Sequence, residues 1–585
     1  MSDVGERITT RYPNAWHAAT DYLRQLGLEL VFGLPADDLE VLPAVESARL
    51  RIMLCRDQRN AAFMATGYAA QSGKPGVCVL GKGPAITNAL TGLLEARSSA
   101  VPLVVLAAGT GQDRRGSGAF QELDQIAVTT PVVKWAHRVD HPDRVIPALE
   151  KAFLAATGGV PGPVYLEFPD HLLRHEIIRG RPWSGLPRTP RGPVTDPVDH
   201  AVVDALLTAR RPTVLAGGGM RHHNADRIVE RFAERIGALL ISTASGRGCL
   251  DENHGQFGGL AGLYAPSETT KLLKTTDLVV ALGSRLEETA TFGWPGLGTT
   301  LPVLQVNIDP LDLSTEYWGP KVAGDAASAL RSWLGVLPDD HEPDPGWLGE
   351  IGRCRETLRH DRRETLALMG KSDDLHVAEV LAAIEKVVPP ERILVQENGL
   401  QDMWSYHYPF YTCAAEGGSI VPSEQTSLGF GVSAAAGVRL AAPDRPVVVF
   451  AGDGAFAMGH GDLGTVVREG IGVLYVVLHN GGYGWLHNQL DRHALDATRY
   501  PFVSKAGAVP RAGDLPGLDQ FVLTRKDELE RELERGLHAG RAGRVAVLHV
   551  PVRLDDVPPG LDVLDGDFPE AGATDQGLEA EHDRG

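Results

Sequence analysis

The sequence predicts an α/β protein with three doubly wound parallel-sheet domains. Three observations support this prediction. Short apolar runs end in Gly or Pro, segments with helical periodicity alternate with these runs, and two Pro-rich segments divide the chain of 585 residues. A length of about 150 residues per domain also gives three or four domains.

The first block has the pattern of successive buried strands separated by helices. Its predicted strands are the apolar runs at 30–35, 51–57, 76–81, 101–109 and 162–169, and its predicted helices lie at 59–71 and 84–97. Residues 183–197 are rich in Pro and Gly and have no helical period, so we interpret them as a linker.

Two further blocks follow with the same pattern. The second has predicted strands at 212–219, 238–245, 276–285 and 303–310, a predicted helix at 225–236, and an end near Leu337. The acidic, Pro-rich segment 338–347 is interpreted as a second linker. The third block runs from about Leu375, with predicted strands at 392–399, 446–454, 473–482 and 544–552. The acidic residues 559–585 are predicted to be a disordered tail.

Charge and cysteine usage exclude several classes of function. The chain has 56 Lys and Arg against 75 Asp and Glu, a net charge of −19, which argues against binding to nucleic acid or to an anionic membrane. Its five cysteines are widely spaced and predict neither a disulfide framework nor a zinc site. The N-terminus has no signal-peptide pattern, so we expect a cytoplasmic protein.

The sharpest local motif lies at the ends of two apolar runs in the third block. Gly452, Asp453 and Gly454 end one run, and Asn480 ends the next, 27 residues after Asp453. Open α/β sheets bind ligands where their strands end, and glycines let the backbone approach a diphosphate. Carboxylate and amide oxygens are ligands that Mg²⁺ prefers. The motif therefore predicts a site for a diphosphate and magnesium.

This motif resembles the signature of the thiamine-diphosphate enzymes of the acetolactate synthase and pyruvate decarboxylase superfamily. Further family-like stretches occur in the family's order: FGLP, AAFMATGYA, GPAITNALTGLLEA, AFQELD, GPVYLEFP, ALGSRLEE, NIDP, TSLGFGVSAAAG and GDGAFAM. The resemblance implies a pyrimidine-binding domain at 1–182, a central Rossmann-like domain at 198–337 and a diphosphate-binding domain at 372–558.

The resemblance also implies site residues. Asp453 and Asn480 correspond to the side-chain metal ligands, and Gly482 to the residue that supplies a backbone carbonyl. Leu428 corresponds to the bulky aliphatic residue that bends the cofactor into a V shape. Many members have Asn-Asn where this chain has His479-Asn480, and we expect the retained Asn to bind the metal. The implied cofactor-binding residues are Gln58, Leu428, Gly452, Asp453, Gly454, Ala455, Asn480, Gly482 and Tyr483.

The family's activating acid is missing. The cofactor reacts through a carbanion at its thiazolium carbon, which forms once a Glu protonates the pyrimidine ring. That Glu lies nine residues before the Gly of a Gly-Tyr pair, and in this chain the pair is Gly67-Tyr68, which places Gln58 there. A Gln amide donates a hydrogen bond but does not titrate, so we expect slow activation. The neighbouring Asp57 is expected to point to the opposite side if the segment leaves a strand.

Three explanations of Gln58 stay open. It is natural in an enzyme that tolerates slow activation, as the family's glyoxylate carboligases do with an aliphatic residue. Alternatively, it was introduced to trap a complex, or the chain is a non-catalytic relative. The retained metal-ligand residues weigh against the last explanation.

Other candidate residues lie on loops of the first block. Phe120 and Gln121 match a family pair near the substrate, and with Gln58 they form the predicted catalytic set. Lys82 stands where small residues are usual, and it is expected either to bind a substrate carboxylate or to face solvent. The adjacent histidines of pyruvate decarboxylases are absent. The corresponding loop has Arg114 and Arg115 instead, and this difference favours carboligation.

The resemblance implies a thiamine-diphosphate- and Mg²⁺-dependent transferase or lyase that acts on a small 2-oxo acid or a related carbonyl compound. The alternatives are a hydrolase that cleaves a diketone and a cofactor-binding protein without activity. Acetolactate synthases hold FAD in the central domain, but the matching stretches here depart from the usual flavin-contacting strings, so we do not expect FAD. A homodimer or homotetramer is expected, because family members share each site between two subunits.

Overall fold

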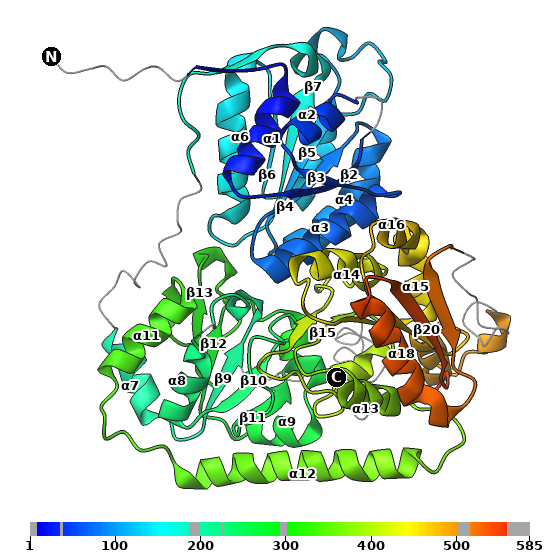
Figure 1. The fold of residues 1–585 in the computed structure, drawn as a ribbon. Coiled ribbons are helices and arrows are strands. Elements are labelled where there is room, and N and C mark those ends of the chain that lie inside the picture. The colour runs from blue at the N-terminus through cyan, green and yellow to red at the C-terminus, as the bar shows by residue number, and fades with distance from the viewer. Residues whose placement is uncertain are drawn as a thin grey trace, which may run out of the picture.

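The computed structural model describes residues 9–35, 39–185, 199–224, 226–292, 301–500 and 515–558. Each of the three domains in this part of the chain is built on a six-stranded parallel sheet flanked by helices. The first domain lies above the central and third domains, which stand side by side (Figure 1). This arrangement confirms the predicted fold class. The predicted acidic tail at 559–585 lies outside the described residues.

The sheet of the first domain contains all five strands expected from the apolar runs, and β6 in addition. Its order is β3 (Arg51–Leu54), β2 (Leu30–Leu34), β4 (Gly76–Leu80), β5 (Leu103–Gly109), β7 (Pro163–Pro169) and β6 (Trp135–Arg138). The flanking helices are α1 (Ala15–Gln25), α2 (Val41–Ser47), α3 (Gln58–Ser72), α4 (Pro84–Ser98), α5 (Gln125–Thr129) and α6 (Pro142–Thr157). A short antiparallel pair, β1 (Thr10–Tyr12) and β8 (Ile177–Arg179), joins the two ends of the domain.

The sheet of the central domain is also parallel throughout. Its order is β11 (Phe257–Leu260), β10 (Leu239–Ser242), β9 (Pro212–Ala216), β12 (Leu278–Leu282), β13 (Val303–Asn307) and β14 (Lys321–Ala323). Its helices are α7 (His200–Thr208), α8 (Ile228–Ile236), α9 (Ser267–Leu273), α10 (Glu288–Thr291) and α11 (Ala326–Val336). Helix α8 begins later than the pattern predicts, after Arg227, which has a positive φ of 50°.

The third domain positions the predicted diphosphate motif. Its sheet order is β16 (Gly418–Ile420), β15 (Ile393–Gln396), β17 (Val447–Gly452), β18 (Leu474–His479), β20 (Val545–Pro551) and β19 (Leu518–Val522). Its helices are α13 (Val377–Val387), α14 (Phe430–Ala441), α15 (Asp453–Gly459), α16 (Leu463–Arg468), α17 (Gly484–Arg492) and α18 (Leu529–Arg541). Because β17 and β18 are hydrogen-bonded neighbours, their carboxyl ends meet at one edge of the sheet.

One of the two predicted linkers is partly wrong. The second one runs into α12 (Pro345–Met369), a helix that lies along the base of the central and third domains (Figure 1). Asp344 caps this helix, and Trp347 in its first turn is buried. At the start of the first linker, Trp183 stacks on Tyr22 of the first domain with 4.5 Å between ring centroids. Residues 186–198 lie outside the described part.

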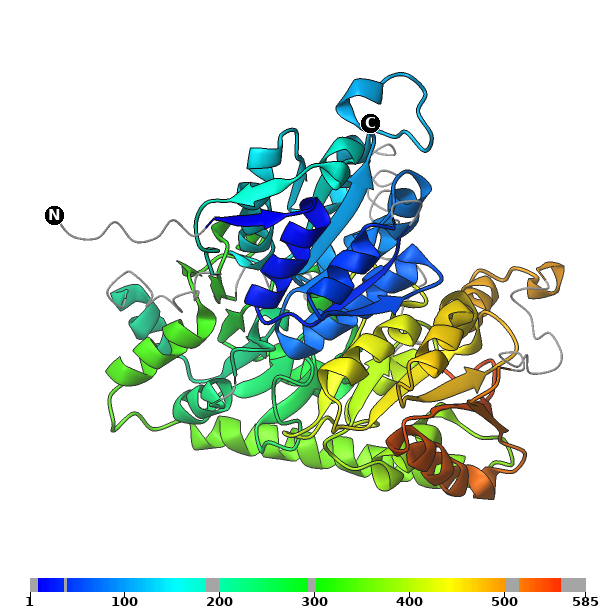
Figure 2. The ribbon, with the colours of Figure 1, turned by 45° about the horizontal axis from the view of Figure 1, so that its top comes forward.

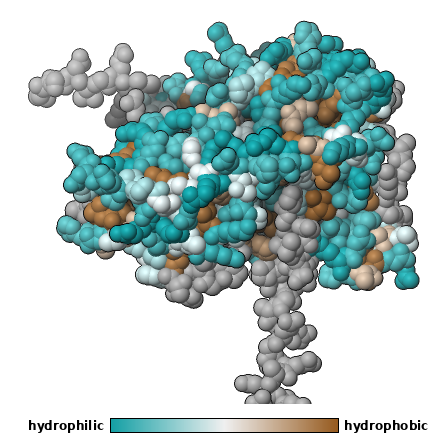
Figure 3. Space-filling model, turned by 90° about the horizontal axis from the view of Figure 1, so that it is seen from below, coloured by the Kyte–Doolittle hydropathy of each residue, from teal (hydrophilic) through white to brown (hydrophobic). Residues whose placement is uncertain are grey.

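The outer surface beneath α12 is mainly hydrophilic, with hydrophobic residues in small patches (Figure 3). None of the helices in the described part of the chain combines the length and the apolar character that a membrane span requires.

Close packing of α3 on α14 joins the first domain to the third. The two helices lie against each other in both views of the ribbon (Figures 1 and 2). A Cβ atom at Gly437 would collide with the carbonyl oxygen of Met64, and one at Gly67 would collide with that of Ala434. These two glycines therefore set the distance between the helices.

We predict that Gly437→Ala destabilises the protein strongly. The added methyl group meets backbone rather than a movable side chain, so the helices must separate, and overpacking of this kind costs about 3 kcal/mol. Differential scanning calorimetry should show a melting temperature lower by about 5 °C or more. Gly352→Ala on the exposed side of α12 is the control, because a Cβ there meets no neighbouring atom within 4 Å. An unchanged melting temperature for Gly437→Ala would show that the two helices adjust freely.

Candidate active site

The carboxyl ends of β17 and β18 bring the predicted metal residues together. Asp453 follows β17, and its two carboxylate oxygens accept hydrogen bonds from the amides of Gly454 at 2.9 Å and Gly481 at 3.3 Å. Asn480 follows β18, and its side-chain oxygen accepts from the amide of Gly482 at 3.1 Å. Backbone amides thus hold the carboxylate and the amide side chain at this edge of the sheet.

A cavity of about 920 Å³ opens beside these residues. Every residue of the third domain that the sequence analysis assigned to the cofactor lines it, namely Leu428, Gly452, Asp453, Gly454, Ala455, Asn480, Gly482 and Tyr483. Two glycines allow close packing of the lining side chains: a Cβ atom at Gly454 would lie 3.1 Å from the Tyr483 ring, and one at Gly484 would lie 2.8 Å from the Asn480 amide nitrogen.

Two buried carboxyl groups near this cavity were not predicted. Glu397 is fully buried and accepts hydrogen bonds from the amides of Gly429 at 3.1 Å and Val432 at 2.9 Å, while burial raises its pKa to about 7. Asp402 lines the cavity and accepts from the Gly452 amide at 3.3 Å. Burial raises the pKa of Asp402 well above its usual range, and its second oxygen has no partner among the described residues.

The loop that carries Leu428 is held by all three domains. Buried Glu95, on α4 of the first domain, accepts from the Ser423 amide at 2.5 Å and from the Ser427 amide at 3.3 Å. Thr289 of the central domain donates to Glu424 in the same loop. Leu428 itself is 38% exposed and faces the cavity, so three domains determine where its side chain lies.

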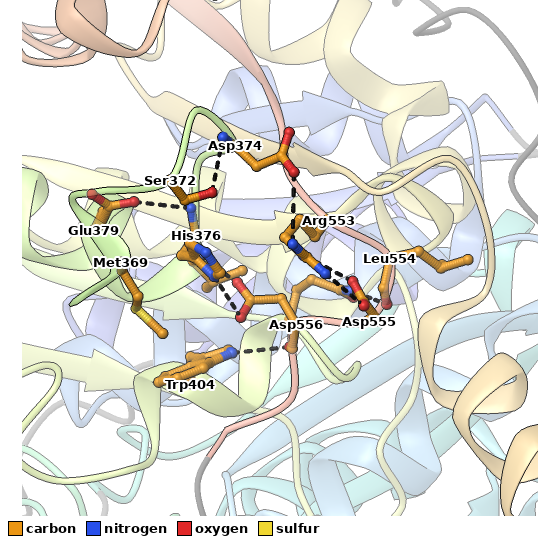
Figure 4. A network of polar contacts seen from close by, with 12 residues as sticks. Met369, Ser372, Asp374, His376, Glu379, Trp404, Arg553, Leu554, Asp555 and Asp556 are labelled. Carbon is orange, nitrogen blue, oxygen red and sulfur yellow. Dashed lines mark hydrogen bonds and ion pairs between the residues drawn. The ribbon is translucent and has the colours of Figure 1, made fainter. Parts of the chain in front are cut away.

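The segment after β20 forms a network of polar contacts with the start of α13 and with Trp404 (Figure 4). The Trp404 indole donates to the backbone oxygen of Asp556 at 3.0 Å, and the Asp556 carboxylate accepts from the Val377 amide at 2.6 Å. Gln401, which lines the cavity, donates to the backbone oxygen of Leu554 at 3.5 Å. These contacts tie the start of α13 and the turn that carries Asp402 to one segment of chain.

His479, which replaces the first Asn of the family motif, is buried and pairs with another histidine. Its Nε2 lies 2.8 Å from Nδ1 of His549, and its Nδ1 lies 3.7 Å from the Asp453 carboxylate. Burial, with a smaller effect of His549, lowers the pKa of His479 to about 4, so its ring is neutral at pH 7.

The predicted catalytic residues of the first domain do not line this cavity. Gln58 begins α3, and its side-chain oxygen accepts a hydrogen bond from Asn88 at 2.8 Å. The prediction that Asp57 points away from Gln58 is wrong, because Asn88 also donates to Asp57 at 3.3 Å. Asp57 caps α3, so the chain is already turning into a helix and the alternation of a strand does not apply.

Phe120 and Gln121 lie on an exposed loop of the first domain. Phe120 is 68% exposed, and Gln121 has a positive φ of 57° and a buried side-chain oxygen without a partner among the described residues. A Cβ atom at Gly83 would lie 2.7 Å from the Gln121 backbone oxygen, so two loops meet here. Buried Gln125 braces them by accepting from the Gly83 amide at 2.6 Å. Backbone strain of this kind often marks functional loops.

The charged residues near this loop differ in their surroundings. Lys82 is 17% exposed and forms an ion pair with Asp170 at 2.9 Å, so it does not simply face solvent. Arg114 and Arg115 are exposed.

Each of the three domains matches a domain of one known protein family. The description "Thiamine pyrophosphate enzyme, N-terminal TPP binding domain" matches residues 14–128, the central domain of the same family matches 200–333, and its C-terminal TPP binding domain matches 397–550. The chain belongs to the thiamine pyrophosphate enzyme family.

Curated relatives of this family member are acetolactate synthases. It is 27% identical over 534 residues to the acetolactate synthase large subunit of Haemophilus influenzae, covering 88% of this chain and 90% of that protein. It is 28% identical over 472 residues to the large subunit of Lactococcus lactis, covering 79% of this chain and 80% of that protein. These matches confirm the prediction of a thiamine-diphosphate-dependent, acetolactate synthase-like enzyme.

Proposed function

We propose that this enzyme uses thiamine diphosphate and Mg²⁺ to make or break carbon–carbon bonds of a 2-oxo acid or a related carbonyl compound. The observation that carries the proposal is the meeting of Asp453, Asn480 and Leu428 in one cavity. When bound, the cofactor supplies a nucleophilic carbon and an electron sink for the loss of carbon dioxide. The acyl unit then passes to an acceptor.

The residues present fit a diphosphate and a magnesium ion. Asp453 and Asn480 would bind the metal with hard side-chain oxygens, and Gly482 would add its backbone oxygen. Glycine at 454 and 484 lets Tyr483 and Asn480 pack directly against the backbone at this end of the cavity. The Asp402 carboxylate oxygen that has no partner among the described residues is a further polar group beside Gly452. Leu428 would support the two rings of the cofactor from its loop.

Gln58 would complete the site from the pyrimidine side. Its amide would donate a hydrogen bond to the ring nitrogen, but it cannot deliver a proton. Phe120 and Gln121 would face the substrate. Since these three residues lie outside the cavity that their own chain forms, we propose that each site is shared between two subunits of a homodimer or homotetramer. The exposed ring of Phe120 supports a covered position in such an assembly.

A panel of 2-oxo acids and diketones tests the proposed reaction. Carbon dioxide release that needs both thiamine diphosphate and Mg²⁺, with a new carbon–carbon bond in the product, is the expected result. Cleavage of a diketone without carbon dioxide release would indicate a hydrolase instead. Cofactor binding without turnover of any compound would indicate a non-catalytic protein.

We predict that Asp453→Ala weakens Mg²⁺-dependent binding of thiamine diphosphate by more than about tenfold, because a charged metal ligand is lost. Isothermal titration calorimetry at fixed Mg²⁺ measures this effect. Asp527→Ala is the control, since Asp527 lies in the same domain, is 64% exposed and pairs only with surface arginine. Equal affinity for Asp453→Ala and the parent would refute the ligand assignment.

We predict that Gln58→Glu accelerates hydrogen–deuterium exchange at the thiazolium carbon of the bound cofactor by at least tenfold. A carboxyl group shares its proton with the ring, and about 1.4 kcal/mol already corresponds to tenfold in rate. Gln71→Glu, near the other end of α3, adds the same charge as a control. An unchanged exchange rate with cofactor bound would mean that another acid protonates the ring.

We predict that light scattering gives the mass of a dimer or tetramer in the presence of cofactor. The physical reason is that Gln58, Phe120 and Gln121 do not line the cavity that their own chain forms, so a second chain would have to supply them. A monomer mass at full cofactor occupancy would contradict shared sites.

A further inference from the structure

Asn88 holds the Gln58 side chain by one end of its amide. Asn88 lies on the second turn of α4, and its Nδ2 donates to Oε1 of Gln58 at 2.8 Å and to Oδ2 of Asp57 at 3.3 Å. The other carboxylate oxygen of Asp57 accepts from the Asn60 amide at 3.1 Å and caps α3. Four side-chain and backbone groups from two helices therefore meet at the start of α3.

The carboxylate of Asp57 decides how both amides are oriented. A carboxylate accepts hydrogen bonds and does not donate them, so the end of the Asn88 amide that faces Asp57 must be the NH₂ group. The same nitrogen contacts Gln58, which must therefore turn its oxygen toward Asn88. No described residue accepts a hydrogen bond from Nε2 of Gln58, so that NH₂ group stays available as a donor.

We propose that Asn88 is a positioning residue that presents the NH₂ group of Gln58 to the pyrimidine ring of the cofactor. This inference rests on the proposed function, which places Gln58 at that ring. The ring nitrogen carries a lone pair and needs a donor. A Gln58 amide turned by 180° would present its oxygen to that lone pair and repel it.

The arrangement also bears on why a glutamine is present. Asn88, oriented by Asp57, donates to the oxygen of the Gln58 amide, and the free NH₂ end is a donor at every pH. Gln58 is therefore held by Asn88 with its NH₂ group free, and it donates without any change of protonation state.

A double-mutant cycle tests the proposal. The variants are Gln58→Ala, Asn88→Ala and the pair, with Thr91→Ala, one turn further along the exposed side of α4, as the control. The readouts are the affinity for thiamine diphosphate at saturating Mg²⁺, measured by calorimetry, and the exchange rate at the thiazolium carbon, measured by NMR. Asn88→Met, which keeps side-chain bulk without a donor, serves as a second variant at the same position.

We expect Gln58→Ala to weaken cofactor binding about fivefold, the effect of one hydrogen bond worth ~1 kcal/mol. Asn88→Ala and Asn88→Met should each give most of that loss and slow the exchange, while Thr91→Ala changes neither. The double variant should match Gln58→Ala alone, because Asn88 acts through Gln58.

Two results would overturn the inference in distinguishable ways. If the two single effects multiply in the double variant, or if Asn88→Ala has no effect while Gln58→Ala does, Asn88 does not position Gln58. If Gln58→Ala itself leaves binding and exchange unchanged, Gln58 does not face the cofactor, and the assignment of Gln58 in the proposed function fails with the inference. Loss of Mg²⁺-dependent binding by Asp453→Ala stays an independent check on the rest of the site.

Discussion

The close approach of α3 and α14 is the contact on which the rest of the site depends. Gly67 and Gly437 remove the side chains that would separate the two helices. Gln58 is the first residue of α3, and Leu428 lies two residues before α14 begins. One packed interface therefore sets where both candidate site segments leave the core, although they do not meet in the same cavity of one chain.

The acidic lining of the cavity supports the proposed role of a divalent cation. Among the described residues that line it, four are acidic and none is Lys, Arg or His. Asp402 and Asp453 lie where β17 ends, and Glu397 is buried nearby; burial raises the pKa of each carboxyl group. In the proposed site, a divalent cation would balance the charge of a diphosphate that lies against these carboxyl groups. The net charge of −19 has the same sign as this local field.

Sequence patterns predicted the fold and the third-domain residues of the candidate site, because both depend on where apolar runs begin and end along the chain. Buried parallel strands read as continuous apolar runs, so their carboxyl ends, and with them Asp453 and Asn480, could be placed on one sheet edge in advance. Helix α12 was missed because its first turn is hidden in an acidic, Pro-rich segment and few of its residues are apolar. Glu397 lies near the carboxyl end of the predicted strand 392–399 and directly follows the observed β15, and that position was a signal that could have indicated it.

The sequence by itself determined the three α/β domains, the family resemblance, the edge of the sheet that carries Asp453, and the replacement of an acid by Gln58. Only the tertiary structure decided that Asn88, thirty residues away on another helix, turns the Gln58 amide, that Asp57 shares this contact, and that Glu95 reaches the Leu428 loop. The physical reason is that periodicity records which face of an element is buried and in which direction its side chains leave. It does not record how two elements are placed against each other, and hydrogen bonds between them depend on that placement to within a few tenths of an ångström.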